Sequence, residues 1–105
     1  WGLVPFEHAS CRKPLVLPNH TSFGDIWKES ALLADVAAWV YDKDLGVERG
    51  IVDVSDAAVK LTKLYTDKAF YNDVAESCFK VTQNPAYRWD RISEAFNKAM
   101  EELSK

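Results

Sequence analysis

Gly2, Pro5 and Glu7 open the chain with the spacing of an anion-binding helix start. Proline suits the first helical position, where its missing N–H would have no partner, and glycine lets the backbone approach a ligand closely. The amides just before Pro5 then point out of the helix start, where the macrodipole favours an anion. Glu7 is about one turn further on, too near that anion to hold it, so we expect it to bind a neutral hydroxyl. The residues alone outline a pocket for a diphosphate and a sugar.

The remaining histidines and carboxylates do not form a catalytic set. His8 follows Glu7 directly, and adjacent helix residues point about 100° apart. His20 is expected in a loop after a strand, at the edge where α/β sheets place ligands, and we interpret it as a polar surface group. We interpret Asp25 as a turn or cap residue and Asp53 as a loop carboxylate, rather than as an acid–base pair. No metal-ligand spacing and no nucleophile–histidine set stands out, so we predict no metal site.

Composition limits the class of protein. The chain has 105 residues, of which 48% are hydrophobic and 12% aromatic, so it can build a core as one domain or part of one. The formal charge of −3 and the scattered Lys and Arg argue against nucleic-acid binding. No apolar run approaches ~18 residues, so no transmembrane segment is predicted.

The cysteines and the first residues favour a cytoplasmic fragment. Cys11 and Cys78 fall on predicted helices, and we interpret them as small, reduced core residues. The chain begins on Trp-Gly without methionine or a charged leader, which predicts an excised piece with no cleavable signal. The Asn19-His20-Thr21 glycosylation triplet is interpreted as a chance match.

Short extended segments dominate the first half. Leu15–Leu17, between two prolines, predicts a short strand buried on both faces, as in parallel sheets. Asn19–Gly24 is predicted as a polar loop, followed by one helical turn at 24–27. Ala31–Tyr41 suits either a helical face or strands, and we favour short extended pieces. A charged turn at 42–46 precedes a strand at Gly50–Val54.

The second half is predicted to be helical. Apolar residues recur at helical spacing from Val54 to Tyr65, in a helix capped by Ser55 or Asp56. Thr66 or Asp67 caps the next helix, which Asn84-Pro85 ends, because proline disfavours α geometry in the residue before it.

A last helix is expected at about 88–104. Its apolar stripe is strict and consists of Trp89, Ile92, Phe96, Met100 and Leu103. The order of elements predicts an α/β fold with a few short parallel strands followed by three C-terminal helices. Such a sheet needs further strands before residue 1. Without them, one edge of the sheet is exposed, and an exposed edge favours self-association.

Two stretches at the start resemble the signature of retaining GT-B glycosyltransferases of family 4 (group 1). That signature runs Glu, any residue, an aromatic, Gly-Leu, three residues and a second Glu, then a small-residue helix and Lys-Pro-apolar-apolar. Trp1–Glu7 and Ala9–Val16 fit it, Ile51–Ala58 is similar to the family's strand and acidic turn, and Trp89 with Ile92 matches the start of its last helix. The resemblance implies that residues 1–105 are a fragment of the nucleotide-sugar-binding C-terminal domain, a partial Rossmann-like half of a GT-B fold.

The resemblance also implies roles for residues at the start of the chain. The family's second glutamate, which binds the ribose hydroxyls of the nucleotide, falls on Glu7. Backbone amides of Trp1, Gly2, Leu3 and Val4 would contact the donor sugar and diphosphate. The family's first glutamate would precede Trp1 by two residues, outside this chain, so the resemblance places no catalytic residue here.

This sequence departs from the family in two places. Arg12 stands where the family usually has glycine at the end of the first helix, and a left-handed backbone there would carry a strain of roughly 1–2 kcal/mol. Ala31–Arg49 is longer and more aromatic than the family's short connection, and we interpret it as an insertion near the rim of the domain.

The implied function is nucleotide-diphospho-sugar-dependent hexosyl transfer with retention. The partners would be the nucleotide-sugar donor, as substrate, and the missing N-terminal domain, with no cofactor, and the fragment alone would be inactive. One alternative is a GT-B relative without transferase activity, such as an epimerase or a phosphorylase. The other is a non-enzymatic helical interaction module that uses Trp89–Leu103.

Overall fold

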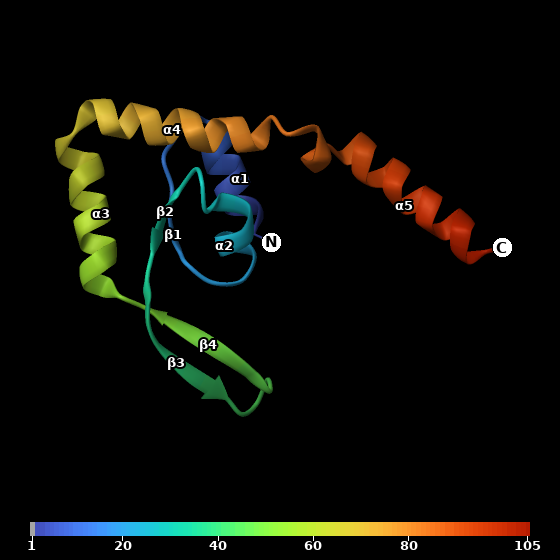
Figure 1. Ribbon diagram of the computed structural model, residues 1–105, viewed down its shortest axis with the longest axis horizontal. Helices are drawn as coiled ribbons and strands as arrows, with labels where there is room; N and C mark the ends of the chain where they lie inside the picture. The colour runs from blue at the N-terminus through green and yellow to red at the C-terminus, as the bar shows by residue number, and fades with distance from the viewer. Residues whose placement is uncertain (1) are drawn as a thin grey trace.

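Two short parallel strands, β1 (Val16–Pro18) and β2 (Leu32–Ala34), lie at the centre of the structure (Figure 1). The computed structural model describes residues 2–105. Val16 pairs with Leu32 and Pro18 with Ala34, and helix α2 (Thr21–Trp27) connects the two strands. The predicted strand is confirmed with a shift of one residue. The predicted polar loop is too long, because α2 already begins at Thr21.

Helix α1 (Leu3–Ser10) packs against this centre through Pro5 and Ala9, which are buried. It ends in a left-handed residue, since Arg12 has a φ of 55°. The amides of Cys11 and Arg12 donate to the carbonyl oxygens of His8 and Ala9, at 3.1 and 2.9 Å. The Arg12 guanidinium lies 3.8 Å above the Phe79 ring and pairs with Glu76. These two contacts hold a non-glycine residue in a conformation that costs it strain.

An antiparallel hairpin, β3 (Val36–Asp42) and β4 (Val47–Val52), projects beyond the parallel pair (Figure 1). The extended pieces expected in Ala31–Tyr41 are confirmed as β2 and β3. The strand expected at Gly50–Val54 is partly wrong, because β4 begins three residues earlier and pairs with β3 rather than joining a parallel sheet. The Ala31–Arg49 region therefore contributes one central strand and most of the hairpin.

Three helices complete the chain: α3 (Val54–Thr66), α4 (Lys68–Thr82) and, after the 3₁₀ turn η1 (Pro85–Tyr87), α5 (Trp89–Leu103). Asp67 caps α4 by accepting from the amide of Phe70, as predicted. The cap of α3 was predicted wrongly, because Asp53 rather than Ser55 or Asp56 accepts the hydrogen bond at its start. The last helix is confirmed to within one residue at each end.

The core is small and centres on Trp27, which has no exposed surface. Around it lie residues of α1, α3 and α4 and one residue just before β1: Ala9, Leu15, Leu64, Val74 and Cys78. Cys78 is thus a core residue as expected, but Cys11 is exposed, because it lies at the end of α1 and not within its packed face. The radius of gyration is 17.0 Å, against roughly 13 Å for a compact 100-residue domain. The hairpin and α5 account for this expansion, since both extend away from the core (Figure 1).

The fold class is mixed α/β. Within residues 2–105 there are five α-helices and two two-stranded sheets, one parallel and one antiparallel. None of these helices combines the length and the apolar character needed to cross a lipid bilayer. Of the few parallel strands that were expected, the described residues form one pair, β1 and β2. The three C-terminal helices are confirmed.

Asp56 ties the parallel strands to α3. Its carboxylate accepts from the amide of Asp35, at 2.8 Å, and pairs with Lys60 one turn along the helix. Asp35 also accepts from the amide of Asp53, at 2.7 Å. The Lys60 ammonium, followed by the Asp35 amide, lowers the pKa of Asp56 below its usual range.

Arg12 offers a test of the left-handed turn after α1. We expect Arg12→Gly to be more stable than Arg12→Ala by about 1 kcal/mol, because both lose the contacts to Phe79 and Glu76 and only alanine keeps the strain. Urea unfolding measures both variants. An alanine variant at least as stable as the glycine variant would show that residue 12 is not left-handed in solution, since glycine would then only add unfolded-state entropy.

The lowered pKa of Asp56 predicts a pH dependence of stability. The pKa of Asp56 is lower in the folded protein than the ordinary value of 3.8, which applies to the unfolded chain. The ionised carboxylate therefore stabilises the fold above pH 3.8, and this stabilisation is lost as the pH falls through the pKa of the folded state. Asp56→Asn should therefore be less stable than wild type at neutral pH, and the gap should narrow below about pH 4. Urea midpoints across pH measure this, with Asp73→Asn, at an exposed carboxylate on α4, as control. A gap that stays constant with pH would contradict it.

Candidate functional site

The start of α1 is the region that the sequence marks for ligand binding. Gly2 is the N-cap residue, with a φ of 80°, and no side chain among the described residues caps this end of the helix. Pro5 occupies the third helical position rather than the first, so the predicted register is wrong by two residues. The amides of Leu3 and Val4 now fall in the first turn, where helical N–H groups have no partner within the helix. The uncapped end still favours an anion.

Gly2 is also fixed by packing within the chain. A Cβ atom at this position would lie 3.0 Å from the ring of Phe23 and 3.4 Å from Pro5. The positive φ and this close approach both require glycine. Phe23 belongs to the first turn of α2, which follows the carboxyl end of β1. The start of α1 and the carboxyl end of β1 therefore lie at one edge of the parallel pair, the edge at which α/β folds bind ligands.

Glu7 is exposed on the outer face of α1. Leu3 and Val4, one turn before it, are 59% and 72% exposed, which is unusual for large apolar side chains at a helix start. Pro5 and Ala9 on the opposite face are buried. The structure therefore brings three of the predicted residues, Leu3, Val4 and Glu7, to one open surface. Trp1, the remaining predicted contact, lies outside the described residues.

The start of α2, which follows β1, adds two residues to this edge. Thr21 has a φ of 53°, a left-handed conformation that is strained for a β-branched side chain. The His20 ring packs edge-on against Trp39, with centroids 5.7 Å apart, and abuts Gly50 at the base of the hairpin. Its Nδ1 is buried and makes no hydrogen bond within the described structure. His20 is thus half-buried, not a surface group as predicted, because the hairpin folds beside it.

No sequence signal pointed to Thr21, since threonine is an unfavourable residue for a left-handed position. The position of His20 at the carboxyl edge was recognised, but its burial depends on the hairpin. Asp53 is the N-cap of α3 rather than a loop carboxylate, and Asp25 is exposed within α2 rather than in a turn or at a cap.

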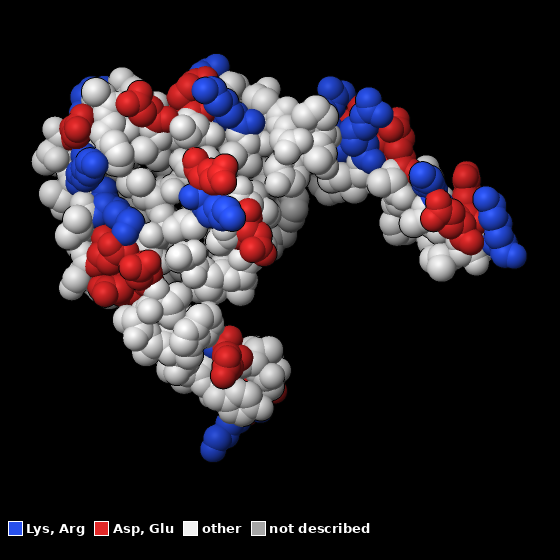
Figure 2. Space-filling model, in the orientation of Figure 1, with Lys and Arg blue, Asp and Glu red and all other residues white. Residues whose placement is uncertain are grey.

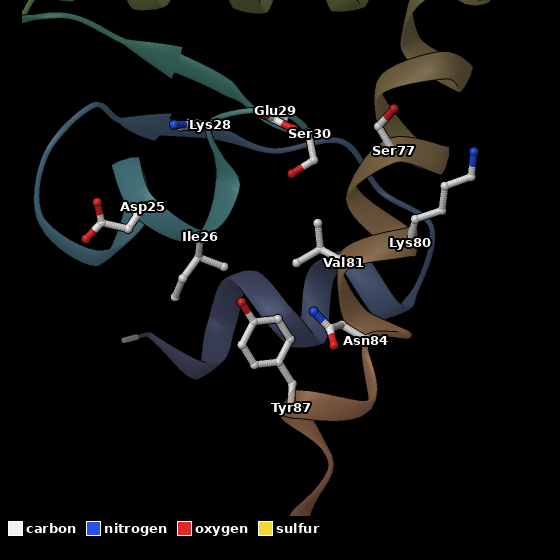
Figure 3. Close-up of a pocket in the computed structure, with 10 residues that line it drawn as sticks. All are labelled: Asp25, Ile26, Lys28, Glu29, Ser30, Ser77, Lys80, Val81, Asn84 and Tyr87. Atoms are coloured by element: carbon white, nitrogen blue, oxygen red, sulfur yellow. The ribbon is translucent and has the colours of Figure 1, made fainter.

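Another cavity lies elsewhere. It is a groove of about 500 Å³ between α2 and the end of α4, lined by Ile26, Ser30, Ser77, Val81 and Tyr87 among others (Figure 3). Apolar side chains lie towards its middle, and the side chains of Asp25 and Lys80 point away from it (Figure 3). The Glu7 carboxylate does not line it. Its shape alone does not favour a particular chemistry.

The two cysteines differ in exposure. Burial raises the pKa of the Cys78 thiol, which donates to the carbonyl oxygen of Ser30 at 3.3 Å. Cys11 is exposed at the end of α1.

Charges are mixed over the visible face. Lys and Arg alternate with Asp and Glu, and no large area of one sign is seen in Figure 2. Across residues 2–105, no three potential metal-ligating side chains come together.

Comparisons with known proteins found no matching family model and no significant match among curated proteins or solved structures. The glycosyltransferase resemblance therefore rests on the residues that carry it.

Proposed function

We propose that this chain is part of the donor-binding domain of a retaining GT-B glycosyltransferase. The Glu7 carboxylate binds the ribose hydroxyls of a nucleoside diphosphate sugar, and the backbone amides from Trp1 to Val4 contact the diphosphate and the sugar. The observation that carries the proposal is the exposed Glu7 beside an uncapped helix start, at the carboxyl edge of a parallel strand pair.

The spacing along α1 suits the two halves of such a ligand. Glu7 lies four residues after Leu3, about 6 Å along the helix axis at 1.5 Å per residue. An anion at the helix start and a hydroxyl pair at Glu7 then fall within the span of a nucleoside diphosphate. A second anion at Glu7 would be repelled, so the carboxylate selects the neutral sugar end.

Arg12 provides a further argument. The family usually has glycine at this position, and the φ of 55° at Arg12 is a conformation that glycine adopts without strain. The turn that leads from α1 to β1 thus has the geometry expected of the family, although the residue differs.

The reaction would depend on stabilising the departing diphosphate. Backbone amides aimed at the diphosphate act as fixed dipoles and need no side-chain nucleophile. In such an enzyme the acceptor would bind to the N-terminal domain, so residues 1–105 by themselves are expected to catalyse no transfer.

Replacement of Glu7 tests the proposal. We expect Glu7→Gln to weaken binding of uridine or guanosine diphosphate by about 10- to 100-fold, because a hydrogen bond to a charged group is worth roughly 1.5–3 kcal/mol. Isothermal titration calorimetry on the wild type and the variant measures the effect.

Glu101→Gln is the matched control, since Glu101 is an exposed carboxylate on α5. It should bind the nucleotide as tightly as wild type. Equal affinity of the Glu7 variant and wild type would contradict the assigned role.

A further inference from the structure

Helix α5 carries an apolar stripe that nothing in the described chain covers. Trp89, Phe96, Met100 and Leu103 are 77%, 65%, 53% and 82% exposed. Charged side chains gather along the opposite side of the helix (Figure 2). A helix with so separate an apolar face is stabilised by burying that face against another element.

We propose that α5 packs antiparallel against α5 of a second copy of this chain. Its apolar residues follow the alternating spacing of three and four that forms a coiled-coil seam: Trp89, Ile92, Phe96, Ala99 and Leu103. All five lie within about 100° of arc around the helix axis at 100° per residue. The proposal does not depend on the nucleotide site.

Side-chain size selects the antiparallel orientation. When Ile92 packs opposite Phe96 of the second copy, Trp89 falls opposite Ala99, so that each large residue meets a smaller one. A parallel pair would instead place Trp89 against Trp89 and Phe96 against Phe96, and would leave Ala99 against Ala99. Two aromatic residues in one layer would be overpacked, and two alanines in one layer would leave a cavity. Both are unfavourable in a packed interface.

Charge selects the same arrangement. In this register Arg88, which flanks the seam at one end, lies beside Glu102 of the second copy, and the two-fold symmetry forms this pair twice. Within one chain Arg88 pairs with Asp90 at 2.9 Å, but both side chains are more than half exposed, so that pair contributes little and can exchange. In a parallel pair Arg88 and Glu102 would be about 21 Å apart along the axis.

The stripe continues into a cleft of about 170 Å³ at the base of α5. Leu3, Phe6 and Tyr87 line it together with Trp89 and Ile92. The antiparallel register brings Leu103 of the second copy past Trp89 towards this cleft. The apolar surface available to the second helix is therefore longer than α5 itself.

The expected affinity is modest. A pair of 15-residue helices forms a small interface, so we expect a dissociation constant on the order of 10–100 μM. Sedimentation equilibrium of the full chain across this range should show a monomer–dimer equilibrium. Phe96→Asp should abolish the dimer, whereas Val59→Asp, at an exposed apolar residue on α3, should leave it unchanged.

A charge exchange tests the orientation. Arg88→Glu and Glu102→Arg should each weaken the dimer about tenfold, and the double variant should restore the wild-type constant. Both single changes place a favourable charge at their end of the helix dipole, so fraying of α5 would not explain a loss.

Three outcomes would overturn the proposal. The first is a chain that remains monomeric throughout the range, as expected if α5 instead serves another domain or protein. The second is a dimer that Phe96→Asp does not weaken. The third is a double charge variant no tighter than the single ones, which would reject the antiparallel register.

Discussion

Burial of Trp27 is the interaction on which the rest of the structure depends. The indole lies at the end of α2 without exposed surface, and the Phe6 ring of α1 packs 4.9 Å from it. Burying a side chain of this size removes about 200 Å² from water, which contributes roughly 5 kcal/mol. Its N–H finds no acceptor among the described atoms, at a cost of roughly 1–3 kcal/mol. Burial therefore outweighs the unmade hydrogen bond.

The same contact orients the candidate site. Because Phe6 and Ala9 face Trp27 and the core, Glu7 must face outward on α1. The contact of Gly2 with Phe23 then holds the helix start beside the carboxyl end of β1. A core of few residues thus determines where the carboxylate and the first-turn amides lie relative to each other.

The hairpin and α5 extend away from this core and contribute no residue to its buried cluster among the described residues. An isolated two-stranded hairpin is only marginally stable, and β3–β4 is joined to the body at its base, through His20 and the Asp35–Asp53 hydrogen bond. Helix α5 follows η1 directly, and its first turn lies beside α1, where Trp89 and Ile92 line a small cleft with Leu3. The exposed large apolar side chains of the described residues lie on these two elements, on α3 and at the start of α1.

Periodic segments were predictable and tertiary contacts were not. The stripe from Trp89 to Leu103 predicted α5 almost to its ends, because helical spacing is a local signal. The pairing of β4 with β3 was missed, since the run Gly50–Val54 suits a parallel or an antiparallel partner equally. Asp53 was not recognised as the cap of α3 because Ser55 and Asp56 are equally good capping residues nearby.

At the candidate site, the exposure of Glu7 was within reach of the sequence, because a carboxylate is almost never fully buried without a partner. The position of Pro5 was not, because the helix begins two residues earlier, at Leu3, where Gly2 can adopt a positive φ. The burial of His20 and the strain at Thr21 depend on the hairpin and on α2, which lie further along the chain.

The central claim is that the start of α1 and Glu7 form one nucleotide site. The most direct measurement is an amide chemical-shift titration of the isotopically labelled chain with uridine diphosphate and guanosine diphosphate. The account predicts saturable shifts at Leu3, Val4 and Glu7. Shifts confined to the groove between α2 and α4, at Ser30, Ser77 and Asn84, with the start of α1 unmoved, would contradict it.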